Sequence, residues 1–206
     1  MTTDTPRLFQ DGTLRSISRE ELADLPIRRY EGNVCLALTP GDLETAMEDI
    51  RNETVVGFDT ETRPAFRKGE SHLPCLVQVA TARTVYLFPL RRPDAYAVLR
   101  SLLEDARVAK AGVALAHDLR ELRQVFTFEH SNVIELGAVA RRCGYGQTGL
   151  RNLAAIFLDI RIPKGSRTSN WAAAQLTHQQ ITYAATDAWV CRELFLRFET
   201  LGLLDR

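Results

Sequence analysis

Two carboxylates separated by a single residue follow a strand-like run in the first third of the chain. The residues from Thr54 to Phe58 are mostly β-branched or aromatic, and Asp59 and Glu61 come directly after them. Because side chains at positions i and i+2 of a strand point to the same face, we expect both carboxylates to stand side by side. Two like charges so placed repel each other, and burial adds to the cost. The pair predicts a bound cation, although a solvated strand end explains the same residues.

Two further stretches place acidic residues on predicted helices. Asp118 lies one turn into a helix expected over 117–126, where an acid also interacts favourably with the helix dipole. Tyr183 and Asp187 are four residues apart in a helix expected after Thr177, so they share one helix face. A core tyrosine beside an exposed aspartate is the alternative for that pair.

The complete set of acids is more informative than any single member. Three or four carboxylates at one point form an oxygen-rich site of the kind that binds Mg²⁺ or Mn²⁺. Two such ions about 3.5–4 Å apart can stabilise both the attacking and the leaving oxygen of a phosphodiester displacement. Histidine and cysteine do not accompany the acids in a ligand-like pattern, which disfavours zinc as the sole metal. The set therefore predicts a two-metal hydrolytic centre.

The elements that must position these residues alternate between strands and helices. A short linker at 81–83 joins two β-rich runs into a predicted hairpin beside the central strand. We therefore expect an α/β domain with a mixed five-stranded sheet, a three-strand antiparallel meander plus two parallel strands, flanked by helices. The expected strands cover 54–61, 75–80, 84–88, 108–113 and 132–136, and the expected helices cover 40–50, 93–103, 117–126, 137–142, 150–157 and 177–201. A run at 33–38 also fits a short strand.

The bulk composition is typical of a globular protein with one domain. The 206 residues include 26 basic and 26 acidic side chains, so the net charge is zero, whereas a protein that coats duplex nucleic acid is normally basic. No apolar run reaches the roughly 18 residues of a membrane span. The four scattered cysteines are typical of reduced thiols. We expect an N-terminal arm over 1–30, one domain over 31–206, a cytoplasmic location and no membrane partner.

With these residues in place, the chain resembles the DEDD 3′–5′ exonucleases, in the branch that carries a tyrosine in its third motif. Ribonuclease D and the exonuclease domain of the Werner-syndrome helicase belong to that branch. The resemblance covers about residues 30–200, and its motifs are Phe58-Asp59-Thr60-Glu61, Lys110 to Leu119, and Tyr183-Ala184-Ala185-Thr186-Asp187, preceded by the loop from Lys164 to Trp171. Val113 stands where the ribonuclease D pattern has a histidine, which leaves the choice between RNA and DNA open. The chain also ends just after the last exonuclease helix, so we expect no additional helical nucleic-acid-binding domain.

The resemblance implies an RNase H-like fold and hydrolysis of the 3′-terminal phosphodiester of a nucleic acid, with release of nucleoside 5′-monophosphates. It implies two divalent cations, Mg²⁺ or Mn²⁺, with Asp59 bridging both. Glu61 and Asp187 would hold the ion that carries the attacking water, and Asp118 would support the other ion. Tyr183 would orient that water. A tyrosine with a pKa of about 10 is a poor base at neutral pH, so we assign it positioning before proton transfer.

Substrate contacts are predicted from the loop before the last helix and from side chains near the acids. Lys164 and Arg167 would contact phosphates, although a solvated loop explains them almost as well. The candidates for stacking on or separating the terminal bases are Gln78, Trp171, Phe66 and Leu76. For Trp171 a place in the core is an equal alternative.

Two other functions stay open at this point. A non-catalytic nucleic-acid-binding or protein-binding module on the same fold would be favoured if an acid were missing, whereas all four acids and the tyrosine are present. A metal-dependent hydrolase acting on a small phosphoester or a nucleotide fits the neutral net charge, but the basic residues of the loop argue against it.

Overall fold

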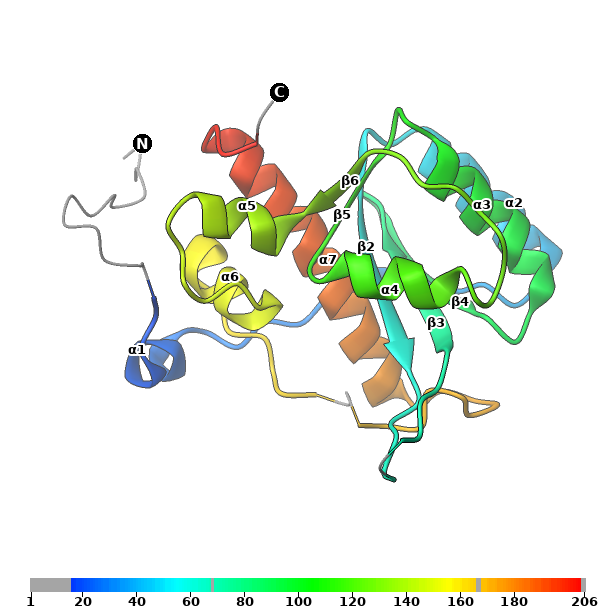
Figure 1. Cartoon of the computed structure of the whole chain (residues 1–206), viewed down its shortest axis with the longest axis horizontal. Coiled ribbons are helices and arrows are strands. Elements are labelled where there is room, and N and C mark those ends of the chain that lie inside the picture. The colour runs from blue at the N-terminus through cyan, green and yellow to red at the C-terminus, as the bar shows by residue number, and fades with distance from the viewer. Residues whose placement is uncertain (1–15, 68, 166–167, 205–206) are drawn as a thin grey trace.

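The computed structural model describes residues 16–67, 69–165 and 168–204. Within these residues, six strands form one mixed sheet in the order β1–β4–β3–β2–β5–β6 (Figure 1). The strands are β1 Asn33–Leu36, β2 Val55–Thr62, β3 Pro74–Ala80, β4 Thr84–Pro89, β5 Ala109–Gly112 and β6 Val133–Glu135. The helices are α1 Arg19–Asp24, α2 Pro40–Arg51, η1 Pro93–Ala95, α3 Tyr96–Glu104, α4 Leu115–Leu122, α5 Leu136–Arg142, α6 Leu150–Leu158 and α7 His178–Thr200. No helix in this described part is long and apolar enough to cross a bilayer.

The mixed α/β sheet is confirmed, but its number of strands differs from the prediction. The strands β2, β3 and β4 form the expected antiparallel meander, and β5 and β6 continue the sheet in parallel with β2. The prediction of five strands is wrong by one, because β1 pairs in parallel with β4, from Asn33 opposite Thr84 to Leu36 opposite Leu87. A four-residue run carries too little periodicity to show which sheet edge it joins. The pairing satisfies the backbone groups on the outer edge of β4, which would otherwise be open.

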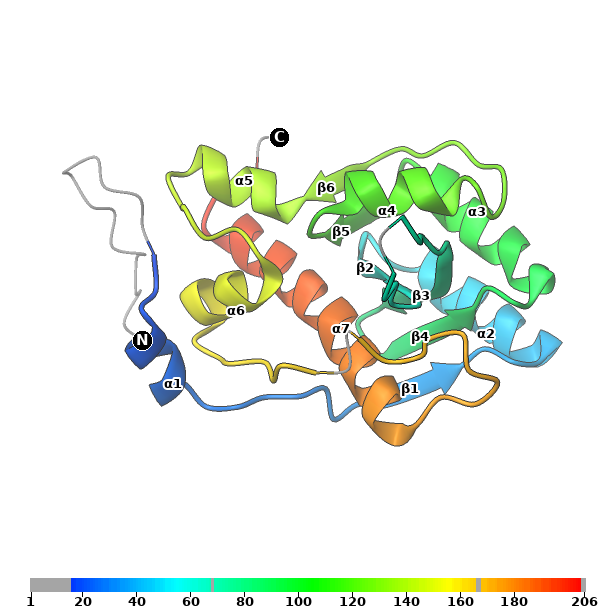
Figure 2. The same cartoon turned by 60° about the horizontal axis from the view of Figure 1, so that its bottom comes forward.

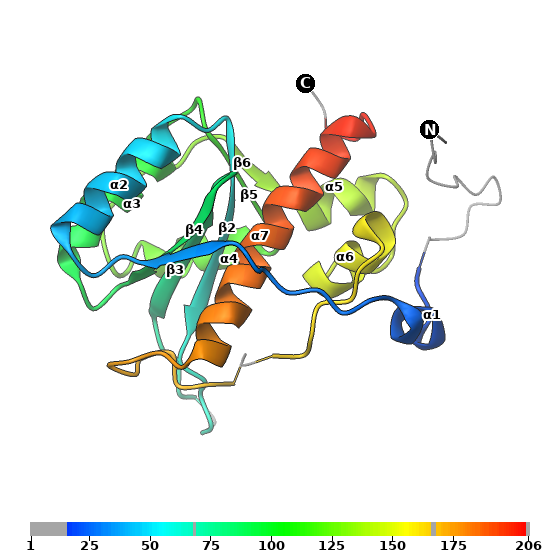
Figure 3. The same cartoon turned by 180° about the vertical axis from the view of Figure 1, so that it is seen from behind.

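Helices cover both faces of the sheet. The helices α2, α3 and α4 pack on the face to which Val56 and Phe58 of β2 contribute. The helix α7 crosses the opposite face, with α5 and α6 beside it. Figure 1 shows α4 in front of the sheet, and Figure 3, seen from behind, shows α7 in front of it. Because side chains alternate along a strand, Gly57, Asp59 and Glu61 all face the α7 side.

The local sequence sets the start of α7. The Thr177 hydroxyl accepts a hydrogen bond from the Gln180 amide at 3.2 Å, and the Gln180 side-chain oxygen accepts one from the Thr177 amide at 3.0 Å. These two hydrogen bonds form a reciprocal capping box at the start of the helix. The Gln180 side-chain amide also donates to the carbonyl of Asn170 at 3.2 Å. The same residue therefore begins the helix and holds the loop that precedes it.

The segment that leads into β1 lies against α7 and against the loop that follows α6 (Figures 2 and 3). The Arg28 amide donates to the carbonyl of Arg161 at 3.0 Å, which attaches the segment to the loop. The Tyr30 amide donates to the Thr186 hydroxyl at 3.0 Å, which attaches it to α7. Backbone hydrogen bonds thus place this part of the N-terminal arm next to the helix that carries Tyr183.

Candidate active site

Three of the four predicted carboxylates converge between β2 and α7. One carboxylate oxygen from each of Asp59, Glu61 and Asp187 lies within 4.8 Å of the other two. Glu61 and Asp187 are buried, and Asp59 is half-buried. Three carboxylates so close together repel one another, and their oxygens form the hard donor set that Mg²⁺ and Mn²⁺ prefer. The residues present therefore fit a divalent cation.

A glycine on β2 makes this convergence possible. A Cβ atom added to Gly57 would lie 1.9 Å from the carbonyl oxygen of Ala188 and 2.8 Å from the backbone nitrogen of Arg192. The helix α7 thus lies directly on the backbone of β2, two residues before Asp59. Small side chains on α7, including Ala184, contribute to the same close packing. This contact brings Asp187 to the strand that carries the other two acids.

The three aspartates of the site, Asp59, Asp118 and Asp187, resist ionisation in the absence of a cation. Burial raises the pKa of Asp59 well above its ordinary value, and the charges of Asp187 and Asp118 raise it further. Burial raises the pKa of Asp187 to about 7, while Tyr183 and the Arg151 guanidinium act in the opposite direction. Burial also raises the pKa of Asp118 to about 6. A bound cation would favour the charged carboxylates and reverse these shifts.

These pKa values predict how stability depends on pH without metal. Because the pKa values of Asp118 and Asp187 are higher in the folded chain than the ordinary value of about 3.9, the folded state binds more protons. Their contribution to stability is complete below about pH 4 and is lost as the pH rises through about 6 and about 7. We expect the Tm in EDTA, followed by circular dichroism, to fall across this window and Mg²⁺ to restore much of the loss. An Asp187→Asn variant should show a shallower fall; an equal slope in both proteins would contradict the assignment.

Asp118 lies outside the cluster of three carboxylates but close enough to influence it. The helix that carries it begins at Leu115, two residues before the expected start, after Ala114 in the left-handed conformation with φ of 65°. The Glu135 carboxylate accepts hydrogen bonds from the amides of Ala114 at 2.9 Å and Leu115 at 2.8 Å. Glu135 thus holds the helix start that places Asp118. We missed Glu135 in the sequence because about twenty residues separate it from the amides that it binds.

Tyr183 is held between a glycine, a tryptophan and the acids. A Cβ atom on Gly165 would lie 1.8 Å from Cδ2 of the Tyr183 ring, so the loop backbone lies directly on the ring. The ring of Trp171 packs against the Tyr183 ring, with the two ring centroids 6.0 Å apart. Burial raises the pKa of Tyr183 far above its ordinary value, and the charges of Asp187 and Glu61 raise it further. The phenol therefore keeps its proton, which suits a hydroxyl that donates a hydrogen bond and not one that acts as a base.

The residues predicted to contact the substrate differ in how exposed they are. Lys164 is exposed beside Tyr183 and Asp187, whereas Arg167 lies outside the described residues. Gln78 is 0% exposed and pairs across the sheet with Asp59, and Trp171 is 2% exposed. Leu76 is also buried, while Phe66, in the loop after β2, is 81% exposed. Of these four candidates for contact with the bases, all of which lie in the described part of the chain, only Phe66 is exposed.

Two cavities open on either side of the loop segment 163–165. One, of about 510 Å³, is lined by Arg151 at the start of α6, and the other, of about 410 Å³, is lined by Arg29 from the arm. Lys164, Tyr183 and Asp187 line both cavities. We did not single out Arg151 or Arg29 in the sequence, because nothing in their spacing relates them to the acids. Two basic residues outside the sequence motifs, Arg151 and Arg29, therefore line the cavities next to the acidic site.

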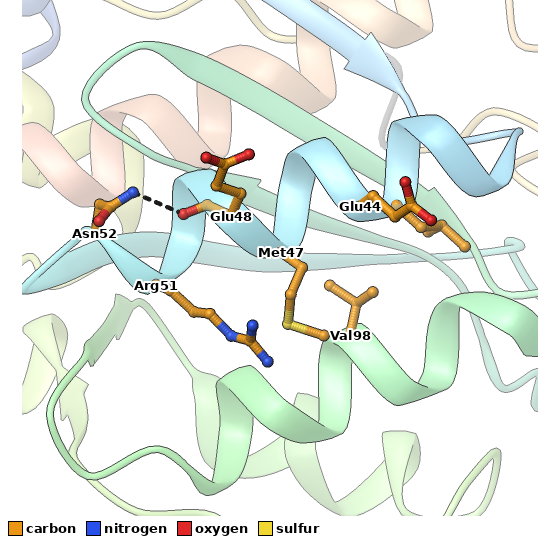
Figure 4. A pocket seen from close by; sticks show the side chains of 7 residues that line it. Glu44, Met47, Glu48, Arg51, Asn52 and Val98 are labelled. Atoms are coloured by element: carbon orange, nitrogen blue, oxygen red, sulfur yellow. Dashed lines mark hydrogen bonds between the residues drawn. The ribbon is translucent and has the colours of Figure 1, made fainter.

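A further cavity lies between α2 and α3, away from these acids. It has a volume of about 560 Å³, and Met47 and Val98 form part of its apolar floor (Figure 4). Its acids, Glu44 and Glu48, both come from α2, and the backbone carbonyl of Glu48 accepts a hydrogen bond from the Asn52 side chain at 2.9 Å. These carboxylates do not converge, so the cavity lacks the geometry of a metal site.

Comparison with known proteins identifies relatives over most of the chain. A family described as 3′–5′ exonuclease matches residues 37–202. Ribonuclease D of Gluconacetobacter diazotrophicus is 33% identical over 178 residues, which are 82% of this chain and 44% of that protein. The mouse bifunctional 3′–5′ exonuclease/ATP-dependent helicase WRN is 28% identical over 190 residues, which are 87% of this chain and 14% of that protein. The chain thus spans less than half the length of these two relatives.

Solved structures share the fold. The Nibbler EXO domain of Aedes aegypti superposes with a TM-score of 0.73 and 23% identity, covering 84% of this chain and 90% of that one. Escherichia coli RNase D superposes with a TM-score of 0.69 and 22% identity, covering 85% of this chain and 47% of that one. A third, Trypanosoma brucei RNase D in complex with RNA U12, has a TM-score of 0.68 and 17% identity, covering 86% of this chain and 64% of that one. The architecture of sheet and helices is therefore that of RNase H-like exonucleases.

Proposed function

Because the chain belongs to the 3′–5′ exonuclease family, we propose that it is a metal-dependent 3′–5′ exonuclease that shortens nucleic acid and releases nucleoside 5′-monophosphates. The convergence of Asp59, Glu61 and Asp187 within 4.8 Å of one another is the observation that carries this proposal. A protonated tyrosine next to this cluster, and two cavities that Asp187 and basic side chains line together, support the same function.

The four acids have different proposed roles in metal binding. The charges of both Asp187 and Asp118 act on Asp59, and Asp59 would therefore contact both of two Mg²⁺ or Mn²⁺ ions. Glu61 and Asp187 would hold the ion that activates the attacking water, and Asp118, outside the cluster, would support the other ion. The ions, when bound, would acidify the attacking water and neutralise charge on the phosphate.

Tyr183 and the basic residues act on the substrate side. The Tyr183 hydroxyl keeps its proton and is assigned to orient the attacking water by a hydrogen bond. Lys164, which lines both cavities, is assigned to the phosphates near the 3′ end. Arg167 is proposed for the same contact from its position in the loop sequence. Asp187 and its neighbours would repel a phosphate, so these cations have a necessary compensating role.

Oligonucleotides with one blocked end test the proposed reaction. Purified protein is incubated with Mg²⁺ or Mn²⁺ and DNA or RNA oligomers that carry a block at the 3′ end, the 5′ end or neither. We expect a ladder that shortens only from a free 3′ end, nucleoside 5′-monophosphates as products, and no reaction in EDTA. Release of phosphate from small esters alone would instead support a phosphoesterase, and oligomer binding without cleavage would support a non-catalytic module.

A Tyr183→Phe variant tests the positioning role of the hydroxyl. Removing one hydrogen bond that acts on the reacting water is expected to lower kcat by about ten- to a thousandfold and to change KM much less. Steady-state kinetics on a 3′-labelled oligomer separate the two constants. An unchanged kcat would reduce Tyr183 to a packing residue.

A second variant shows whether the ring position matters as well as the hydroxyl. Gly165→Ala places a Cβ atom against the Tyr183 ring, so the ring or the loop must shift. We expect Gly165→Ala to lower kcat in the wild-type background and to have little further effect in the Tyr183→Phe background. Equal losses in both backgrounds would mean that the glycine acts on something other than the tyrosine hydroxyl.

The cytoplasm is the proposed location. The four cysteines are free thiols, with Cys191 buried and the others half-buried, which supports a reducing compartment.

A further inference from the structure

The cavity on the arm side of Tyr183 and Asp187 has the size and charge of a nucleotide site. Its volume of about 410 Å³ lies within the range of small-ligand pockets. Arg29, Lys164 and His178 line it from three different segments: the arm, the loop after α6 and the first turn of α7. The cavity therefore brings the cationic side chains of Arg29 and Lys164 next to residues assigned to the reaction.

Arg29 is available to bind a ligand. Its side chain is exposed, and within the described residues it takes part in no hydrogen bond or ion pair. A guanidinium presents paired N–H groups that match two oxygens of a phosphate. Because no carboxylate of the described chain neutralises Arg29, its charge remains free to compensate an incoming phosphate group.

The arm holds Arg29 at the cavity by contacts on both sides of it. The Arg28 amide donates a hydrogen bond to the backbone carbonyl of Arg161. The Tyr30 amide donates one to the hydroxyl of Thr186, which is the residue next to Asp187. The Tyr30 ring also packs on Trp189 of α7, with centroids 6.0 Å apart. The backbone on each side of Arg29 is therefore fixed to the elements that form the site.

Arg29 precedes the part of the chain that matches the exonuclease family, which begins at residue 37. We propose that Arg29 binds a phosphate group of a nucleotide in this cavity, and that the arm is thereby part of the substrate-binding or product-binding site. The phosphate belongs either to the strand that remains bound or to the nucleoside 5′-monophosphate that is released. The inference rests on the proposed exonuclease function.

Binding measurements on Arg29→Ala test the inference. Calorimetric titration with adenosine 5′-monophosphate measures the product, and titration of a single-stranded DNA oligomer in EDTA, at several salt concentrations, measures the strand. Because Arg29→Ala removes a charge-assisted contact, at least one of the two affinities, for the monophosphate or for the oligomer, should weaken by about tenfold. A weaker affinity for the monophosphate alone assigns the cavity to the released nucleotide. A weaker affinity for the oligomer, with a salt slope reduced by about 0.7, assigns it to a phosphate of the strand.

Two matched variants separate a specific contact from the loss of a charge. Arg28→Ala removes the same charge from the neighbouring residue, which is exposed and does not line the cavity, so both affinities should be unchanged. Arg29→Lys should retain part of the affinity. The Tm of Arg29→Ala should equal that of the wild type, because the side chain has no described partner. Equal losses in Arg28→Ala and Arg29→Ala, or no loss in either, would overturn the inference.

The same samples distinguish failure of this inference from failure of the proposed function. Wild-type protein that shortens oligomers, together with an Arg29→Ala variant of unchanged affinity, would refute the role of Arg29 and leave the exonuclease intact. Wild-type protein that binds the monophosphate through Arg29 but shortens no oligomer would refute the exonuclease and retain the phosphate site.

Discussion

An Asp59→Asn variant is expected to lose 3′ trimming and to become more stable without metal. Asp59 belongs to the carboxylate cluster, and a neutral amide is a much weaker ligand for Mg²⁺ or Mn²⁺. Cations in such sites contribute several kcal/mol to the transition state, so we expect a loss of about a thousandfold or more in kcat/KM. Burial and neighbouring acids raise the pKa of Asp59, so removing its charge also relieves repulsion in the metal-free protein.

The activity and the Tm of this variant should change in opposite directions. Unfolding would lower both, so it cannot produce the expected result. Activity should fall while the Tm in EDTA rises, and Mg²⁺ should raise the Tm less than it does in the wild type. Glu44→Gln on α2 removes an exposed acid of the distant cavity and should leave activity unchanged. Near-wild-type activity of Asp59→Asn would refute the metal centre proposed here.

A Gly57→Ala variant is expected to lose both stability and activity by separating β2 from α7. The new Cβ atom would lie 1.9 Å from the Ala188 carbonyl oxygen, and both groups belong to backbones of regular elements. Neither can rotate away, so the helix must move from the strand. Overpacking of this kind costs about 1–3 kcal/mol, and the shift also moves Asp187 away from Asp59. Urea unfolding followed by circular dichroism measures the first effect, and trimming by the folded fraction measures the second.

A second glycine provides the matched control for this variant. Gly41 lies in the first turn of α2, where an added Cβ meets no atom closer than 3.9 Å. Gly41→Ala should keep full activity and change stability by less than about 1 kcal/mol, in the stabilising direction. If Gly57→Ala behaves like Gly41→Ala, the close contact between α7 and β2 does not hold the site together.

Much of the fold follows from local patterns in the sequence. The alternation of side chains in β2 puts Asp59 and Glu61 on one face whatever the neighbours are, because it depends only on strand geometry. The capping box of Thr177 and Gln180 sets the start of α7, and the spacing of Tyr183 and Asp187 then puts both on one helix face. The hairpin of β3 and β4 is also local, since a short turn joins the two strands.

The parts that sequence patterns did not reveal all depend on contacts between distant segments. The strand β1 joins the edge at β4, across about fifty residues, and its own four residues carry no information on that partner. Gln78 was a candidate for contact with the terminal bases. In the structure it pairs with Asp59 on the neighbouring strand, and its side chain is 0% exposed on a sheet face that α7 covers. Glu135 and Arg29 reach the site from other elements, with no spacing that relates them to the motifs.

The sequence alone identified the candidate residues for the proposed chemistry. It also determined on which face of each element they stand, because the direction of side chains follows periods of two and 3.6 residues. Only the tertiary structure decided that Asp59, Glu61 and Asp187 meet while Asp118 stays outside their cluster. That outcome depends on how closely α7 approaches β2, and the absence of a side chain at Gly57 allows the approach. Close packing between elements is a property of pairs of surfaces, and neither surface specifies it by itself.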